Sequence, residues 1–190
     1  MRSLRQMMPG LAVGAAVFAM AGPAFALDEI TFGTNWVAEA EHGGFYQAVV
    51  DGTYEKYGLK VTIVPKAEEA MLLGGKINFY MVGNLLQTFS AAEQSVPVEV
   101  VAAIFQKEPQ IIMAHPESGL KTFGDLAKLK SIFIGDDLFI SGYQWMKSTY
   151  PGITDEQRKP YDYSIAPFLA DKDSGQQGYV TSEPYAVKKA

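Results

Sequence analysis

The sequence of 190 residues contains no cysteine and only two histidines, His42 and His115. Without cysteine there can be no disulfide, no thiolate metal ligand, no thiol nucleophile and no lipid-modified cysteine anchor. Two distant imidazoles are too few for a histidine metal site. We therefore expect neither a metal nor any other cofactor.

Basic residues are also scarce, because 16 Lys and Arg face 21 Asp and Glu and the formal net charge is −5. No run of Lys and Arg could follow a phosphate backbone, so a nucleic-acid partner is not expected. Hydrophobic residues make up 48% of the chain, enough to build a substantial core. The composition favours an acidic globular protein.

The first 26 residues have the pattern of a cleavable export signal. Arg2 and Arg5 precede the apolar run "LAVGAAVFAMA", and small residues, Ala24 and Ala26, stand at positions −3 and −1 of the expected cleavage site. The run is shorter than the ~20 residues that a membrane-spanning helix needs. We expect cleavage after Ala26, a mature net charge of −7 once both arginines are lost, and a periplasmic protein.

After residue 28 the sequence alternates short β-rich runs with helical segments. A single helix is expected over about 42–57, and strands are expected at "LKVTIV", "INFYMV", "PVEVVAAIF", "QIIMAH" and "SIFIG", with a last one ending near Thr181. Such alternation predicts an α/β fold with parallel sheets, since parallel neighbours need crossover connections. We expect two lobes with a cleft between them, joined through extended segments near residues 105–113.

Candidate binding residues follow the expected strands, where α/β sheets bind ligands. The stretch "TNWVAEAEHGGFYQA" offers an amide and an indole for a flat ring, and glycines at a helix start that expose backbone N–H groups. Two alternatives remain open: that Trp36 only covers a core, and that His42 is an ordinary surface residue. The predicted ligand-binding residues are Asn35, Trp36, His42, Gly43, Tyr46, Gly83, Asn84, Asp137, Glu183 and Tyr185.

No predicted group pairs a nucleophile with a base, as covalent catalysis requires. Asp136 and Asp137 are adjacent, and adjacent acids point apart in an extended segment, so they give no sign of a catalytic dyad. We therefore expect recognition without catalysis.

Four segments together resemble one family, the SsuA/THI5-like (NMT1-type) substrate-binding proteins of ABC importers. They begin at "TNWVAEAEHGGFYQA", "GKINFYMVGNLLQ", "LKTFGDLAKLKSIFIG" and "QQGYVTSEPYAV". The resemblance implies a type II periplasmic-binding-protein fold, two lobes with parallel-sheet cores and helices on both faces. Its implied parts are a signal peptide (1–26), lobe 1 (27–107), lobe 2 (108–182) and the start of a return segment to lobe 1 (183–190).

Within that family the sequence looks closest to binders of thiamine-pyrimidine precursors and related flat heterocycles. The implied partners are a small heterocyclic ligand and an ABC permease in the inner membrane. The implied site residues are Asn35, Trp36, His42, Tyr46, Glu183 and Tyr185. Pyrimidine synthases of the same superfamily are a rival interpretation, but their cysteine-rich motif and the accompanying Lys and His are missing from "INFYMVGNLLQT".

The resemblance also predicts a C-terminal truncation, because family members continue well beyond the position of Ala190 to complete the first lobe. The second crossover and the C-terminal part of the fold would then be incomplete. We expect a monomer in which uncovered apolar surface would favour association. The alternative to a transport protein is a shortened remnant or interaction module.

Overall fold

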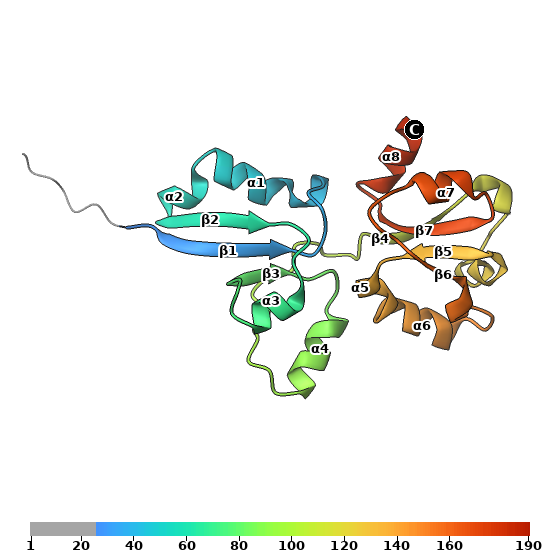
Figure 1. Cartoon of the computed structure of the whole chain (residues 1–190), viewed down its shortest axis with the longest axis horizontal. Helices are drawn as coiled ribbons and strands as arrows, with labels where there is room; N and C mark the ends of the chain where they lie inside the picture. Colours follow the sequence, from blue (N-terminus) through green and yellow to red (C-terminus); the bar gives the residue numbers. More distant parts are fainter. Residues whose placement is uncertain (1–25) are drawn as a thin grey trace, which may run out of the picture.

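The computed structural model describes residues 26–190, so the expected export signal lies, apart from Ala26, outside the described residues. The chain forms two groups of elements, each built on one sheet (Figure 1). We call residues 28–93 the N-terminal lobe and residues 110–189 the C-terminal lobe. Within residues 26–190, no helix combines the length and apolar character needed to cross a membrane.

The N-terminal lobe has a parallel sheet of three strands in the order β2-β1-β3. Helices α1 and α2 lie on one side of it and α3 and α4 on the other (Figure 1). The elements are β1 (Asp28–Thr34), the 3₁₀ helix η1 (Ala40–His42), α1 (Gly43–Val50), α2 (Thr53–Lys56), β2 (Leu59–Val64), α3 (Glu69–Leu73), β3 (Phe79–Met81) and α4 (Leu86–Glu93).

The C-terminal lobe has a four-stranded sheet in the order β4-β7-β5-β6, in which only β4 runs antiparallel to its neighbour. Residues 183–190, expected to begin a return to the first lobe, form α8, which contacts β7. The elements are β4 (Gln110–Ala114), η2 (Pro116–Ser118), η3 (Phe123–Lys128), β5 (Ser131–Ile134), α5 (Asp136–Phe139), α6 (Gly142–Thr149), η4 (Asp155–Gln157), β6 (Arg158–Pro160), α7 (Ala166–Ala170), β7 (Ser174–Tyr179) and α8 (Glu183–Lys189).

This mixed α/β architecture with parallel pairing confirms the expected fold class. The helix expected over 42–57, however, is wrong as a single element. Gly52 adopts a left-handed φ of 70°, and the Asp51 carboxylate accepts a hydrogen bond from the Thr53 backbone N–H at 2.9 Å. The left-handed glycine ends α1, and the Asp51 side chain caps the turn from which α2 begins.

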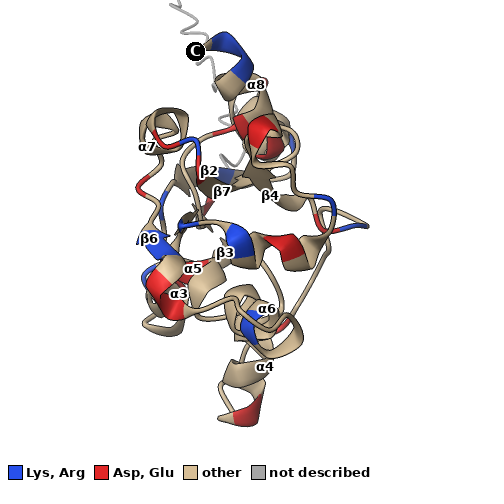
Figure 2. Cartoon of the chain, turned by 90° about the vertical axis from the view of Figure 1, so that its right-hand side faces the viewer, with Lys and Arg blue, Asp and Glu red and all other residues tan. Residues whose placement is uncertain are grey.

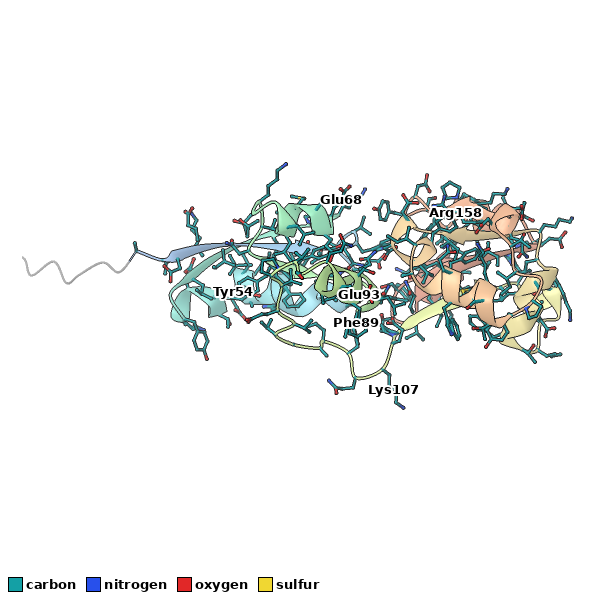
Figure 3. The ribbon with its side chains drawn as sticks, turned by 90° about the horizontal axis from the view of Figure 1, so that it is seen from below. Tyr54, Glu68, Phe89, Glu93, Lys107 and Arg158 are labelled. Carbon is teal, nitrogen blue, oxygen red and sulfur yellow. The ribbon has the colours of Figure 1, made fainter. Side chains whose placement is uncertain are left out.

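The strand expected at "PVEVVAAIF" is also wrong, since residues 97–105 form no strand. Val100 and Val101 are 57% and 74% exposed, and the segment leaves α4 as an extended loop from which Lys107 projects (Figure 3). A β-rich run becomes a strand only when a neighbouring strand supplies its hydrogen bonds. Within the described residues, no strand pairs with this run.

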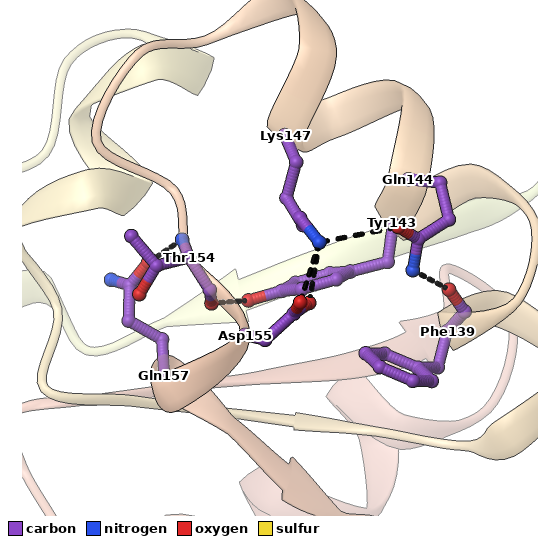
Figure 4. Close-up of polar contacts among 7 residues, drawn as sticks. All are labelled: Phe139, Tyr143, Gln144, Lys147, Thr154, Asp155 and Gln157. Carbon is purple, nitrogen blue, oxygen red and sulfur yellow. Dashed lines mark hydrogen bonds and ion pairs between the residues drawn. The ribbon is translucent and has the colours of Figure 1, made fainter.

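The apolar core lies mainly in the C-terminal lobe, where Ile132, Ile134 and Tyr143 are fully buried in one cluster. Figure 4 shows the polar contacts beside it: Tyr143 donates its hydroxyl to the Thr154 carbonyl at 2.8 Å. The buried apolar residues of the N-terminal lobe are Ala67, Ile77 and Ala91. The C-terminal lobe is therefore the better packed of the two.

Gly33 allows the closest packing in the N-terminal lobe. A Cβ atom at this position would lie 2.6 Å from the Cβ of Ala67 and 2.7 Å from Cδ1 of Ile77. The segment after β2 can therefore pack directly on the end of β1, and backbone bonds attach it there: Ala67 N–H donates to the Thr34 carbonyl and Lys66 N–H to the Trp36 carbonyl. This attachment fixes the backbone that carries Trp36.

Candidate functional site

The candidate site lies where strand ends of the two lobes face each other. Asn35 and Trp36 directly follow β1, Gly83 and Asn84 follow β3 after one residue, and Asp137 lies in the first turn after β5. Side-chain hydrogen bonds join the lobes here. Asn84 Nδ2 donates to Ser141 Oγ at 3.1 Å, and the Glu41 carboxylate accepts from the hydroxyls of Thr181 at 2.6 Å and Ser182 at 2.7 Å.

A small, partly open cavity of about 10 Å³ lies between the lobes, with room for about one water molecule. Its wall combines one indole and one phenol ring with amide and carboxyl groups. The lining residues are Asn35, Trp36, Glu39, Gln110, Asp137, Gln177, Gly178, Tyr179 and Glu183.

A larger hollow of about 340 Å³ adjoins this cavity, and both include Glu39 and Glu183 in their walls. Its volume falls within the range of small-molecule sites, ~300–1,000 Å³. Three tyrosine rings and two hydroxyl side chains line it beside the shared carboxyls. The lining residues are Glu39, Ala40, Tyr161, Tyr163, Ile165, Thr181, Ser182, Glu183, Tyr185 and Ala186.

Trp36 connects the two spaces through aromatic contacts across the lobes. Its ring centroid lies 4.5 Å from that of Tyr163, edge to face, and 5.3 Å from that of Tyr161. A Cβ at Gly135 would lie 3.3 Å from the far edge of the indole, so the glycine leaves room for it. Trp36 thus supports the two tyrosines that bound the larger hollow.

Glu183 is only 4% exposed, yet both of its carboxylate oxygens are held by donors. The Tyr161 hydroxyl donates to Oε1 at 2.9 Å, and the Tyr179 backbone N–H donates to Oε2 at 2.7 Å. These bonds fix the start of α8, and they hold a carboxyl group in the wall of both spaces.

Two further carboxyl groups of the site are perturbed by their surroundings. Burial, together with the nearby Glu183 and Glu41 carboxyls, raises the pKa of Glu39 to about 7. Burial also raises the pKa of Asp137. At neutral pH, Glu39 is therefore poised between its two protonation states.

The structure brings together only part of the predicted site. Asn35, Trp36, Asp137 and Glu183 line the small cavity, and Tyr185 joins Glu183 at the larger hollow. Gly83 belongs to this group by proximity, since a Cβ there would lie 2.9 Å from both Asn35 Nδ2 and Asp137 Oδ2. Asn84 forms the interlobe hydrogen bond to Ser141.

Like Gly83 and Asn84, three more predicted residues line neither space: His42, Gly43 and Tyr46. His42 is 1% exposed, its Nδ1 accepts from the Glu39 N–H at 3.3 Å, and burial lowers its pKa. Its place is therefore beneath the turn that presents Glu39, rather than on the cavity wall.

The sequence did not single out Glu39, Tyr161, Tyr163 or Gln177. Glu39 and Glu41 both lie in the stretch "TNWVAEAEHGGFYQA", and their spacing does not show which of the two faces a cavity. Gln177 accepts the Gly135 N–H at 2.8 Å through its side chain. The two tyrosines follow β6, a strand whose residues Arg158–Pro160 carry no strand pattern.

The raised pKa of Glu39 predicts that stability falls as pH rises. The carboxyl has a pKa of 4.5 in an unfolded chain and about 7 in the folded one, so the folded state keeps its proton longer. Its contribution is fully present below pH 4.5 and is lost towards pH 7. The free energy of unfolding should fall by about 1–2 kcal/mol, less than the full pKa shift implies because Glu39 is partly exposed to solvent.

Urea unfolding of the wild type and of Glu39→Gln at pH 4.5 and pH 7.5 measures this loss. The wild type should lose more unfolding free energy than the variant over that interval, because groups that are not coupled to Glu39 titrate alike in both proteins and cancel in the comparison. An equal loss in both proteins would contradict the assignment.

Among known families, the sequence model of the NMT1/THI5-like family matches residues 39–137, more than half of the chain. The match begins at Glu39 and ends at Asp137, two residues that line the small cavity.

No curated protein matches the chain. Within residues 26–190, no three His, Cys, Asp or Glu side chains are arranged to hold a metal ion.

Proposed function

The chain belongs to the NMT1/THI5-like family, which includes solute-binding proteins, and on this premise we propose that it binds a small solute between its lobes. The ligand is a flat, polar heterocycle, pyrimidine-like, and the protein releases it chemically unchanged. In this proposal the protein is the periplasmic solute-binding component of an ABC importer and passes the ligand to a membrane permease.

The observation that carries this proposal is the 340 Å³ hollow with tyrosines along its wall and carboxyls at its base. Aromatic faces stack on flat rings, and a fixed carboxylate accepts hydrogen bonds from ring N–H or amino groups. Tyr161 and Glu183 provide one group of each kind, and the hydrogen bond between them holds the ring and the carboxylate in place. A saturated or purely apolar solute would not use these groups together.

The arrangement of the lobes also supports reversible capture. In the described part of the chain, residues 94–109 provide the covalent link between the lobes. The contacts between them include the side-chain hydrogen bonds of Glu41 and Asn84 and the packing of Trp36 on Tyr161 and Tyr163. Opening would break these hydrogen bonds and separate Trp36 from the tyrosines, and closing around a ligand would restore both.

Tryptophan fluorescence tests the proposal, because the chain has only two tryptophans, Trp36 and Trp145. In a Trp145→Phe protein, the emission reports on Trp36 alone, beside the hollow. Titration with 4-aminopyrimidines should change this emission saturably. The non-aromatic polar ring of myo-inositol should not. A folded sample that gives no response to any aminopyrimidine would overturn the proposal.

A further inference from the structure

The walls of the two interlobe spaces carry three carboxyl groups and no basic side chain. These are the carboxyls of Glu39, Asp137 and Glu183. A fourth acid, Glu41, lies nearby and accepts hydrogen bonds from the hydroxyls of Thr181 and Ser182. The salt bridges of residues 26–190 are all formed by other acids: Glu29, Asp125, Asp136, Asp155 and Asp173.

Carboxylates removed from water without a cationic partner are destabilised. Glu183, almost fully buried, has two neutral donors but no cation. Glu39 lies near enough for the Glu183 and Glu41 charges to disfavour its ionisation. A positive charge placed between Glu39 and Glu183 would pair with both carboxyls and offset the repulsion that disfavours ionised Glu39.

The aromatic rim of the hollow already attracts ammonium groups. Lys66 Nζ lies 4.2 Å from the ring centroid of Tyr163, and Lys189 Nζ lies 4.9 Å from that of Tyr185. Both lysine residues are exposed and neither lines the hollow. The lysines of α8 lie in its last turn, which is blue in Figure 2, and its one acid, Glu183, lies in its first turn. These contacts show that the rings can carry a cation, while the inner carboxyls stay unpaired.

We propose that the hollow selects a positively charged ligand: a flat heterocycle bearing a protonated amine, whose ammonium group lies between Glu39 and Glu183. This inference rests on the proposed function and adds the charge of the solute to it. The ring packs on the tyrosines, and the ammonium group donates to the carboxylates. A ligand with a negative group would meet the carboxyls of Glu39 and Glu183 in the hollow and is rejected.

Three pyrimidines that share one ring test the charge preference at pH 7. All are 2-methylpyrimidin-4-amines, and position 5 carries an aminomethyl group (cationic), a hydroxymethyl group (neutral) or a carboxylate (anionic). Calorimetric titration of the wild-type protein should give at least tenfold tighter binding of the aminomethyl compound than of the hydroxymethyl compound. The carboxylate should show no saturable binding.

The outcomes separate this inference from the proposed function. Equal affinities for all three compounds, or tighter binding of the carboxylate, would overturn the charge preference and leave heterocycle binding intact. If none of the three binds to folded protein, both proposals fail.

Glu39→Gln and Glu117→Gln form a matched pair of variants that remove one negative charge each. Glu117 is exposed and lies in η2, outside both spaces. Glu39→Gln should reduce the ratio of the hydroxymethyl to the aminomethyl dissociation constant at least fivefold, and Glu117→Gln should leave the ratio unchanged. If both variants alter the ratio equally, long-range charge rather than the site sets the preference, and the inference fails.

Discussion

Replacing Tyr143 by alanine should cost about 3–5 kcal/mol of unfolding free energy, the range for a buried aromatic truncated to alanine. Tyr143 is 0% exposed, belongs to the main core cluster and packs on Phe139 at a centroid distance of 5.7 Å. Natural domains have only about 5–15 kcal/mol to lose. Urea denaturation followed by near-ultraviolet circular dichroism measures the change.

Two variants show which part of Tyr143 matters. Tyr143→Phe keeps the ring and loses the bond to the Thr154 carbonyl, so about 0.5–1.5 kcal/mol should be lost. Trp145→Ala truncates a larger ring on the same helix, but that ring is 52% exposed, so its loss should stay near 1 kcal/mol. If Tyr143→Ala costs no more than Trp145→Ala, Tyr143 is not a core residue.

The strands predicted correctly are those in which a short apolar run has a partner in the sheet. "LKVTIV" becomes β2 beside β1, and "SIFIG" contains β5 between β7 and β6. "PVEVVAAIF" is equally rich in apolar residues and forms no strand. Conversely, β6 has the sequence Arg-Lys-Pro, and pairing with β5 makes it a strand. Composition suggests a strand, but a neighbour decides it.

The candidate site was predictable to the extent that it follows strand ends. Asn35, Trp36, Asp137 and Glu183 were predicted from that position, and all four line one cavity. His42 and Tyr46, predicted from their positions at the start of a helix, line neither space, because the face of a helix that meets the other lobe depends on packing between segments far apart in sequence. Glu39 and Tyr161 come together only through the same packing.

Replacing Trp36 by alanine should weaken ligand binding about 10- to 100-fold. The indole supports the rings of Tyr161 and Tyr163, and its removal would join the small cavity to the larger hollow. The loss corresponds to about 1.4–2.8 kcal/mol. Trp36 does not line the hollow, so the effect comes from the loss of support for the tyrosine rings on which the ligand packs. Calorimetry with the aminomethyl pyrimidine measures it without a fluorescent reporter.

Trp145→Ala is the matched control, since Trp145 packs on Phe123 and Tyr150 of the C-terminal lobe and lines neither interlobe space. It should bind the pyrimidine with wild-type affinity, whereas Trp36→Phe should recover part of what Trp36→Ala loses. If the two alanine variants bind equally well, ligand binding does not depend on the aromatic wall between the lobes. The heterocycle would then have to bind elsewhere, because the Trp36 indole is what packs on both Tyr161 and Tyr163 from the N-terminal lobe.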